Sequence, residues 1–181
     1  MDEVHFRPAD LADADAIGAL HVQSWRESYP GILPNQLLHG LSVEARSKMW
    51  RTILSDLPAL NESDVFVAEG PIGIVGFGAC GRQRDSAFRD NGFDAEIGAI
   101  YVLKAAQRGG IGKGLMRLMA QAMIGRGRRA ASLWVLHQNA PARAFYELLG
   151  GALLGERCEE LAGASIIEVA YGWSNLTHLA C

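Results

Sequence analysis

A glycine-rich turn between a strand-forming segment and an amphipathic helix is the feature that most restricts what this chain can fold into. Residues 95–103 are rich in Ile, Tyr and Val, and residues 110–124 repeat apolar side chains at helical spacing. Between them lies Gln107-Arg108-Gly109-Gly110-Ile111-Gly112. Such a turn points several backbone N–H groups and the positive end of a helix at one spot, and its glycines let a ligand approach closely. The unit therefore predicts a sheet with an anion-binding turn at the end of one strand.

Two familiar phosphate-binding turns do not match this segment. A Walker loop needs Ser or Thr after its lysine, whereas Lys113 is followed by Gly114. A dinucleotide-binding turn needs GxGxxG and an acidic residue about twenty positions further on, whereas Gly110, Gly112 and Gly114 give GxGxG with no such acid. From the pattern alone, a turn with a purely structural role is an open alternative.

Basic residues are concentrated around the same turn. The segment from Ile97 to Tyr146 contains eight Lys or Arg and no Asp or Glu, so the rest of the chain has a net charge of −11 within a total of −3. Charge this one-sided favours an anionic ligand, although Arg126, Arg128 and Arg129 also fit a solvated helix face. Because the pI is about 5.9, we expect a small polyphosphate ligand and no nucleic-acid partner.

Length and composition indicate one globular domain covering residues 1–181. The three cysteines, Cys80, Cys158 and Cys181, show no CxxC spacing, so we expect neither a disulfide framework nor a metal site. The chain starts Met-Asp-Glu, unlike a signal peptide, and its apolar runs are shorter than a membrane span. These features predict a cytoplasmic protein without membrane association.

Periodicity and turn residues predict an α+β or α/β fold, with helices packed against a sheet. Strands are expected where β-branched and aromatic residues cluster, and helices where apolar residues recur every three or four positions. Residues 82–92 are expected to form a polar loop. The predicted strands are 4–7, 65–69, 72–81, 95–103, 132–136, 152–160 and 165–173, and the predicted helices are 11–25, 32–54, 110–124 and 139–149.

Two motifs in this order resemble the GNAT superfamily of N-acetyltransferases, in its bacterial, acetyl-CoA-dependent form. Gln107, Gly110 and Gly112 match the family's acetyl-CoA motif Q/R-x-x-G-x-G/A. The later run Asn139-x-x-Ala-x-x-Phe-Tyr-Glu-x-x-Gly is similar to the family's next helix, and the strand Leu133–Leu136 lies between the two. The sequence departs from the family at 104–106, where Lys-Ala-Ala replaces a linker that commonly contains proline.

The resemblance implies a fold and a binding site. The fold is a central, mixed, mostly antiparallel, splayed sheet of about seven strands flanked by about four helices. The pyrophosphate of acetyl-CoA is expected on the turn, and the pantetheine arm beside the preceding strand. Asn139 is expected to contact the arm, to cap its own helix, or both. The implied acetyl-CoA-binding residues are Ile100, Tyr101, Val102, Gln107, Arg108, Gly109, Gly110, Ile111, Gly112, Lys113 and Asn139.

Acetyl transfer to an amine needs a base, because an alkylamine is almost wholly protonated at neutral pH. Glu96 is the candidate, acting directly or through water, in an apolar segment where burial is expected to raise its pKa; a surface position is the alternative. Glu69 and Asp94 are weaker candidates. The oxyanion is expected on a backbone N–H near Ile100 or Tyr101. The resemblance places Tyr146 beside the sulfur, as general acid or hydrogen-bond donor, and we expect Phe145 rather than Tyr146 to face the core.

The acceptor is not identified by these motifs. Trp25 and Tyr29 are candidates for lining its pocket, with a place in the core as the alternative. Acids at Asp85, Asp90, Asp94 and Glu96 favour a cationic acceptor, which is either a small amine or a peptide N-terminus. A non-catalytic acyl-CoA-binding sensor or regulatory domain is the alternative function, although Glu96 and Tyr146 together favour catalysis. Exposed final strands make a homodimer a further hypothesis.

Overall fold

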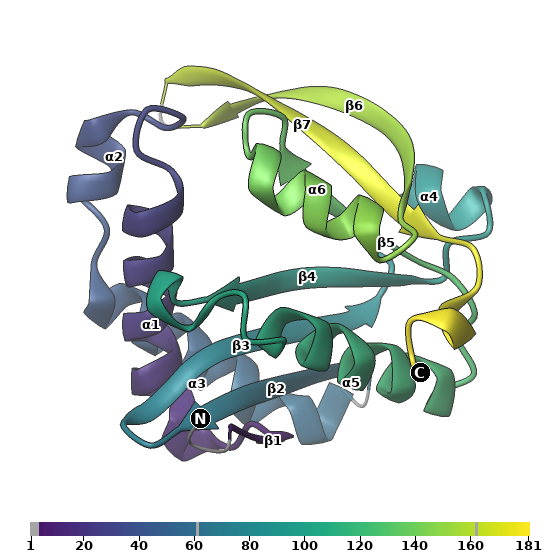
Figure 1. Ribbon diagram of the computed structural model, residues 1–181, viewed down its shortest axis with the longest axis horizontal. Coiled ribbons are helices and arrows are strands. Elements are labelled where there is room, and N and C mark those ends of the chain that lie inside the picture. Colours follow the sequence, from purple (N-terminus) through teal and green to yellow (C-terminus); the bar gives the residue numbers. More distant parts are fainter. Residues whose placement is uncertain (1–3, 61, 162) are drawn as a thin grey trace.

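A mixed seven-stranded sheet forms the centre of the protein (Figure 1). The computed structural model describes residues 4–60, 62–161 and 163–181. The strand order is β1-β2-β3-β4-β5-β7-β6, and each neighbouring pair is antiparallel except the parallel pair β4 and β5. The strands are β1 (His5–Pro8), β2 (Ser63–Gly70), β3 (Gly73–Arg82), β4 (Ala95–Val102), β5 (Ala131–Leu136), β6 (Ala152–Leu161) and β7 (Ala164–Trp173).

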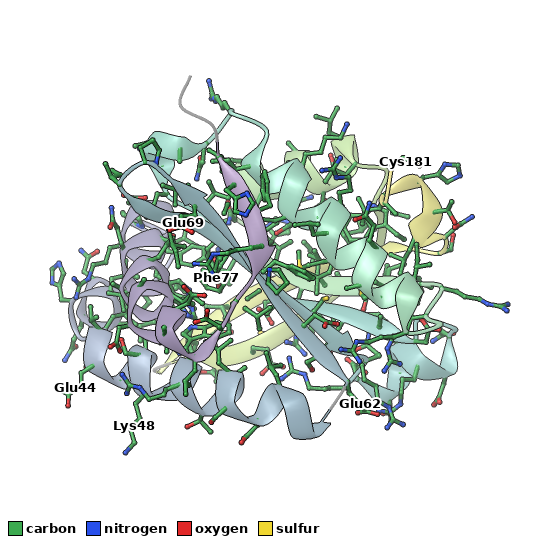
Figure 2. All side chains as sticks on the ribbon, turned by 90° about the horizontal axis from the view of Figure 1, so that it is seen from below. Glu44, Lys48, Glu62, Glu69, Phe77 and Cys181 are labelled. Carbon is green, nitrogen blue, oxygen red and sulfur yellow. The ribbon has the colours of Figure 1, made fainter. Side chains whose placement is uncertain are left out.

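Six α-helices are present in the described part of the chain, and the long ones cover both faces of the sheet. Helices α1 and α3 pack together against β2, β3 and β4, whereas α5 packs against the opposite face (Figure 2). Glu44 and Lys48 point away from the sheet on the outer side of α3. The helices are α1 (Ala14–Ser28), α2 (Asn35–His39), α3 (Val43–Leu60), α4 (Ser86–Asp90), α5 (Ile111–Gly125) and α6 (Ala140–Leu148).

Strand alternation divides the core into two layers, because successive side chains point to opposite faces. Val65 and Val67 of β2 join the cluster formed by α1 and α3, while Phe66 of the same strand joins the cluster of α5. Gly18 allows α1 and α3 to approach closely, since a Cβ atom there would lie 2.4 Å from Ser47 Oγ. The sheet is therefore sandwiched between helices at its β2–β4 half.

The seven predicted strands are confirmed within a few residues, and the helices differ in two places. The predicted helix 32–54 is two helices, because the chain turns at Gly40 between α2 and α3. The polar loop 82–92 contains the short helix α4, which is capped by the Asp85 side chain accepting a hydrogen bond from the Ala87 N–H at 2.9 Å. A single turn of helix with a local cap gives too little apolar periodicity to be seen in the sequence.

Candidate active site

Strands β4 and β5 separate after a short contact, and the site forms where they diverge. Only two residue pairs connect them, Ala95 with Ala131 and Glu96 with Ser132. The register of β4 against β3 shifts between Ile97 and Ala99, which makes Gly98 the extra residue of a β-bulge. Beyond the bulge, β4 keeps β3 as its neighbour on one side and has no strand partner on the other within the described residues.

Backbone alternation identifies which groups face this open side. The Leu103 N–H donates to the Val75 carbonyl at 3.0 Å, so the N–H and C=O of Leu103 and Tyr101 point toward β3. The backbone groups of Ile100 and Val102 therefore point the other way, toward the gap. The Gln107 side chain already uses part of this edge, because its amide donates to the Val102 carbonyl at 3.0 Å. Of the two positions expected to supply an oxyanion N–H, only Ile100 has the right orientation.

The glycine-rich turn continues this open edge. Gly110 adopts a φ of 82° at the cap of α5, and Arg108 also has a positive φ of 63°. The first helical bond runs from the Gly114 N–H to the Gly110 carbonyl at 2.9 Å. Within the part of the chain that the structure describes, the backbone N–H groups of residues 108–113 donate no hydrogen bond. They form a set of donors at the positive end of a fifteen-residue helix.

Helix α6 lies against the start of α5. A Cβ atom on Gly112 would come within 3.1 Å of Phe145 Cζ, so the glycine lets the two helices meet. The Asn139 side chain accepts a hydrogen bond from the Ala142 N–H at 3.4 Å, which is the capping role. The approach of Phe145 to Gly112 thus places α6 beside the glycine-rich turn.

The expectation that Phe145 rather than Tyr146 faces the core is wrong. Tyr146 is the buried residue of the pair, only 7% exposed, and its ring lies 6.0 Å from that of Tyr171 and 6.2 Å from that of Trp173. Phe145 is only partly buried, against the N-terminal end of α5. The reason is that Tyr146 faces two aromatic residues of β7, and the helical repeat alone does not reveal which side of α6 meets that strand.

The Tyr146 hydroxyl is nevertheless free to bind a ligand. Among the described residues this hydroxyl makes no hydrogen bond. It is also not one of the fully buried polar atoms that lack a partner. Burial is the main cause of a raised pKa for Tyr146, and the nearby Tyr101 adds to it. A phenol with a raised pKa donates a hydrogen bond but gives up its proton reluctantly.

Glu96 lies at the closed end of the gap, and its surroundings differ from those expected. Its carboxylate contacts the guanidinium of Arg84 and also accepts the Arg84 backbone N–H at 3.0 Å. The apolar environment inferred from the neighbouring residues is therefore wrong. Ala95 and Ile97 do enter the core, but Glu96 alternates to the opposite face, where the loop after β3 returns.

The two weaker candidates for a base have structural roles. Glu69 pairs with the Nε of Arg7 at 3.0 Å. Asp94 accepts hydrogen bonds from the backbone N–H groups of Arg129 and Ala130 at 3.1 Å. Both carboxylates thus hold parts of the fold together, and neither is available near the gap.

Trp25 and Tyr29 lie beside the hydroxyl of Tyr101. The Trp25 indole N–H donates to this hydroxyl at 3.0 Å, and the Tyr29 ring packs edge-on against that of Trp25, with centroids 5.3 Å apart. Burial is the leading cause of the raised pKa values of both Tyr29 and Tyr101. His21 stacks on the Tyr101 ring with centroids 4.8 Å apart. The two candidate pocket residues are therefore part of a packed aromatic cluster beside β4.

Three residues near the gap were not anticipated from the sequence. His21 accepts the Trp50 indole N–H at 3.1 Å, and burial lowers its pKa to about 4. Arg84 contacts the Glu96 carboxylate through both its guanidinium and its backbone N–H. Glu168 of β7 accepts two hydrogen bonds from Arg157, at 2.9 and 2.7 Å. Each of these contacts joins separate elements, and no local motif marks them.

The basic segment is partly used in structure. Arg126 pairs with Asp64 at 2.7 Å and Arg128 donates to the Asp94 carbonyl at 3.0 Å, so neither belongs to a purely solvated face. Lys104, Arg108 and Lys113 remain exposed or half-buried around the turn. No helix in the described part of the chain is long and apolar enough to span a membrane. Nor does any group of three or more His, Cys, Asp or Glu there lie together as metal ligands would.

Comparisons with known proteins agree with this geometry. The model of the acetyltransferase (GNAT) family matches residues 23–150. A Bacillus subtilis (strain 168) protein described as uncharacterized N-acetyltransferase YuaI is 33% identical over 177 residues, which cover 97% of this chain and 96% of that protein.

Solved structures share the fold at lower identity. The PaiA N-acetyltransferase of Thermoplasma acidophilum, in complex with coenzyme A, has a TM-score of 0.72 at 17% identity, over 94% of this chain and 99% of that one. YncA of Salmonella typhimurium, with acetyl-CoA, has a TM-score of 0.68 at 19% identity, over 96% and 94%. The predicted splayed-sheet fold is confirmed.

The matched region contains β4, the glycine-rich turn, α5 and α6. The chain therefore belongs to the acetyltransferase (GNAT) family, and it is an acetyltransferase.

Proposed function

We propose that this protein transfers the acetyl group of acetyl-CoA to a primary amine by direct attack through a tetrahedral intermediate. One observation carries the proposal: the open edge of β4 leads, through a short turn at residues 104–106, to the backbone N–H groups of residues 108–113, which donate no hydrogen bond among the described residues. A pyrophosphate fits the donors of the turn, and an extended arm bearing amides fits the backbone groups of Ile100 and the N–H of Val102, whose carbonyl is used by Gln107. Side chains of Lys104, Arg108 and Lys113 add positive charge there.

Each step of the reaction has a candidate group. Glu96 takes the proton of the incoming ammonium, directly or through water, which leaves a neutral amine. The nitrogen then attacks the thioester carbon, and the Ile100 N–H stabilises the oxyanion. The carbon–sulfur bond breaks as one of the two protons on the positively charged nitrogen passes to the sulfur, and Glu96 releases its own proton to solvent. The products are the acetylated amine and free coenzyme A thiol.

Tyr146 acts in this scheme as a hydrogen-bond donor to the departing sulfur. A phenol with a pKa of about 10 would lose about 2 kcal/mol by protonating a thiolate whose acid has a pKa of about 8.5. Burial of Tyr146 raises its pKa and widens that gap. The ammonium of the intermediate is a far stronger acid and supplies the proton instead.

The experiment is a thiol-release assay with acetyl-CoA and a panel of small amines and peptides. Release that depends on an amine, together with the acetylated product by mass spectrometry, would support the transferase. The competing proposal is a non-catalytic acyl-CoA-binding sensor, which would bind coenzyme A in calorimetry and release no thiol with any amine. The free hydroxyl of Tyr146 favours the transferase, because a sensor has no need of a donor in the gap.

A homodimer is a secondary proposal and rests on the edge of the sheet. Strand β6 is the last strand in the order, and it is exposed along most of its length. Leu153 and Ile167 on the β6–β7 hairpin are 60% and 42% exposed. A monomer in light scattering would exclude this assembly.

A further inference from the structure

Arg84 and Glu96 form a fixed pair at the closed end of the gap. The carboxylate of Glu96 contacts both the guanidinium and the backbone N–H of Arg84. The two side chains differ sharply in exposure, because that of Glu96 is 15% exposed and that of Arg84 is 81% exposed. The carboxylate of Glu96 is thus largely enclosed, while the guanidinium of Arg84 next to it is exposed to solvent.

The guanidinium of Arg84 extends over the β-bulge. A Cβ atom on Gly98 would lie 3.7 Å from Arg84 Nη2 and 3.9 Å from Glu96 Oε1. Only Nε of the guanidinium is used by Glu96, and the terminal nitrogens Nη1 and Nη2 have no acceptor among the described residues. Two parallel donors in this form are the usual partner of a carboxylate.

Of the carboxylates near Arg84, only that of Glu96 contacts its guanidinium among the described residues. Arg89 donates to the backbone carbonyls of Gln83 and Arg84 at 3.2 and 3.5 Å, so its guanidinium is used to hold the loop after β3. Asp85 caps α4, and Asp94 binds the backbone N–H groups after α5. Asp85 and Asp94, two of the four acids that favoured a cationic acceptor from sequence, are therefore used within the fold.

We propose that the acceptor is a small amine that carries a carboxylate close to its nitrogen, as an α-amino acid does. This inference rests on the proposed function and names its substrate class. The amine lies against Glu96, and the carboxylate accepts two hydrogen bonds from the terminal nitrogens of Arg84. Because the side chains of Arg84 and Glu96 are in contact, a substrate can bind both of them only if its amine and its carboxylate are also close together.

Other amines fit this pair poorly. A peptide N-terminus has a neutral carbonyl where an amino acid has its carboxylate, so it gains little from the guanidinium. A polyamine brings a second positive charge toward the guanidinium of Arg84, and like charges repel. The site thus discriminates by the charge next to the amine.

The test compares each amino acid with its own carboxamide. For the wild type, kcat/KM for thiol release is measured with the twenty common amino acids and with the matching carboxamides. Loss of a hydrogen-bonded charge pair predicts a preference of about 10- to 100-fold for the carboxylate. In Arg84→Gln this ratio should fall to near one. The ratio cancels any effect of Arg84 on Glu96, because both substrates need the same base.

Arg82→Gln is the matched control, since Arg82 is 57% exposed and pairs only loosely with Glu62 at 3.5 Å. It should keep the wild-type ratio. Equal rates with acids and carboxamides in the wild type, or a ratio that survives in Arg84→Gln, would overturn the proposal. Calorimetry of the same ligand pairs with the coenzyme A-loaded protein provides an independent test: the carboxylate should bind at least tenfold more tightly in the wild type and not in Arg84→Gln. If no amine of any kind is acetylated while coenzyme A binds, it is the transferase function that fails.

Discussion

Replacing Tyr146 by Phe separates a catalytic role of the hydroxyl from a structural role of the ring. The ring is buried against Tyr171 and Trp173, and phenylalanine retains all of that packing. The hydroxyl has no hydrogen-bond partner among the described residues, so its loss leaves no buried group unpaired. We therefore expect the free energy of unfolding to change by less than about 0.5 kcal/mol.

The effect on turnover should be much larger. A hydrogen bond to a charged group contributes about 1.5–3 kcal/mol, which corresponds to a loss of about 10- to 100-fold in kcat. The affinity for acetyl-CoA should hardly change, because the charge on sulfur develops only as the bond breaks. Full proton transfer from the phenol is not expected, since burial raises the pKa of Tyr146. The pH–rate profile of Tyr146→Phe should accordingly keep the same shape on its basic side as that of the wild type.

The measurements are kcat by thiol release, the dissociation constant of coenzyme A by calorimetry, and the melting temperature. Tyr171→Phe is the matched control, because the Tyr171 hydroxyl donates to Glu147 and accepts from Arg143 Nε at 3.2 Å. That variant should lose stability and keep most of its kcat. An unchanged kcat in Tyr146→Phe would remove the hydroxyl from the mechanism. A large drop in its melting temperature would refute the claim that the hydroxyl is unpaired.

Three further predictions concern proton transfer, pH and packing. In Glu96→Gln the acidic limb of the pH–rate profile should vanish, and a limb that persists would assign the base to another group. Burial lowers the pKa of His21 to about 4, so the unfolded chain takes up a proton at a higher pH than the folded protein does. The free energy of unfolding should therefore be unaffected by the protonation of His21 above pH ~6.5 and should fall by up to about 3 kcal/mol toward pH ~4. Urea unfolding at pH 7 and pH 4.5 should show a smaller difference in His21→Gln than in the wild type. Gly18→Ala should destabilise the fold by about 1–3 kcal/mol, because the new Cβ would meet Ser47; an unchanged melting temperature would mean that α1 and α3 adjust freely.

The glycine-rich turn was predictable from sequence because its physics is local. Gly110 adopts the left-handed conformation that glycine tolerates, and the helix that follows has its apolar residues at a regular spacing. The same holds for the seven strands, whose side-chain composition predicts them one at a time. Short helices were harder, as α4 shows, since five residues contain too few repeats of a helical pattern.

The candidate site was only half predictable. Motif positions around Gln107 and Asn139 are set by neighbours in the chain, and both have local hydrogen bonds, to Val102 and Ala142. The surroundings of Glu96 were misjudged because its partner, Arg84, lies twelve positions earlier in the chain, in the loop after β3. Trp25 likewise binds Tyr101 across 76 positions of the chain.

By itself, then, the sequence determined most of the elements, their order and the glycine-rich turn before α5, because each depends on residues a few positions apart. Tertiary structure alone decided that β4 and β5 diverge at the bulge of Gly98, and that Ile100 faces the gap. It also decided that Tyr146 enters the core and that Arg84 turns its free nitrogens outward over Glu96. These outcomes depend on how separate elements pack against one another, and the packing angle and register that control them are not contained in any local pattern.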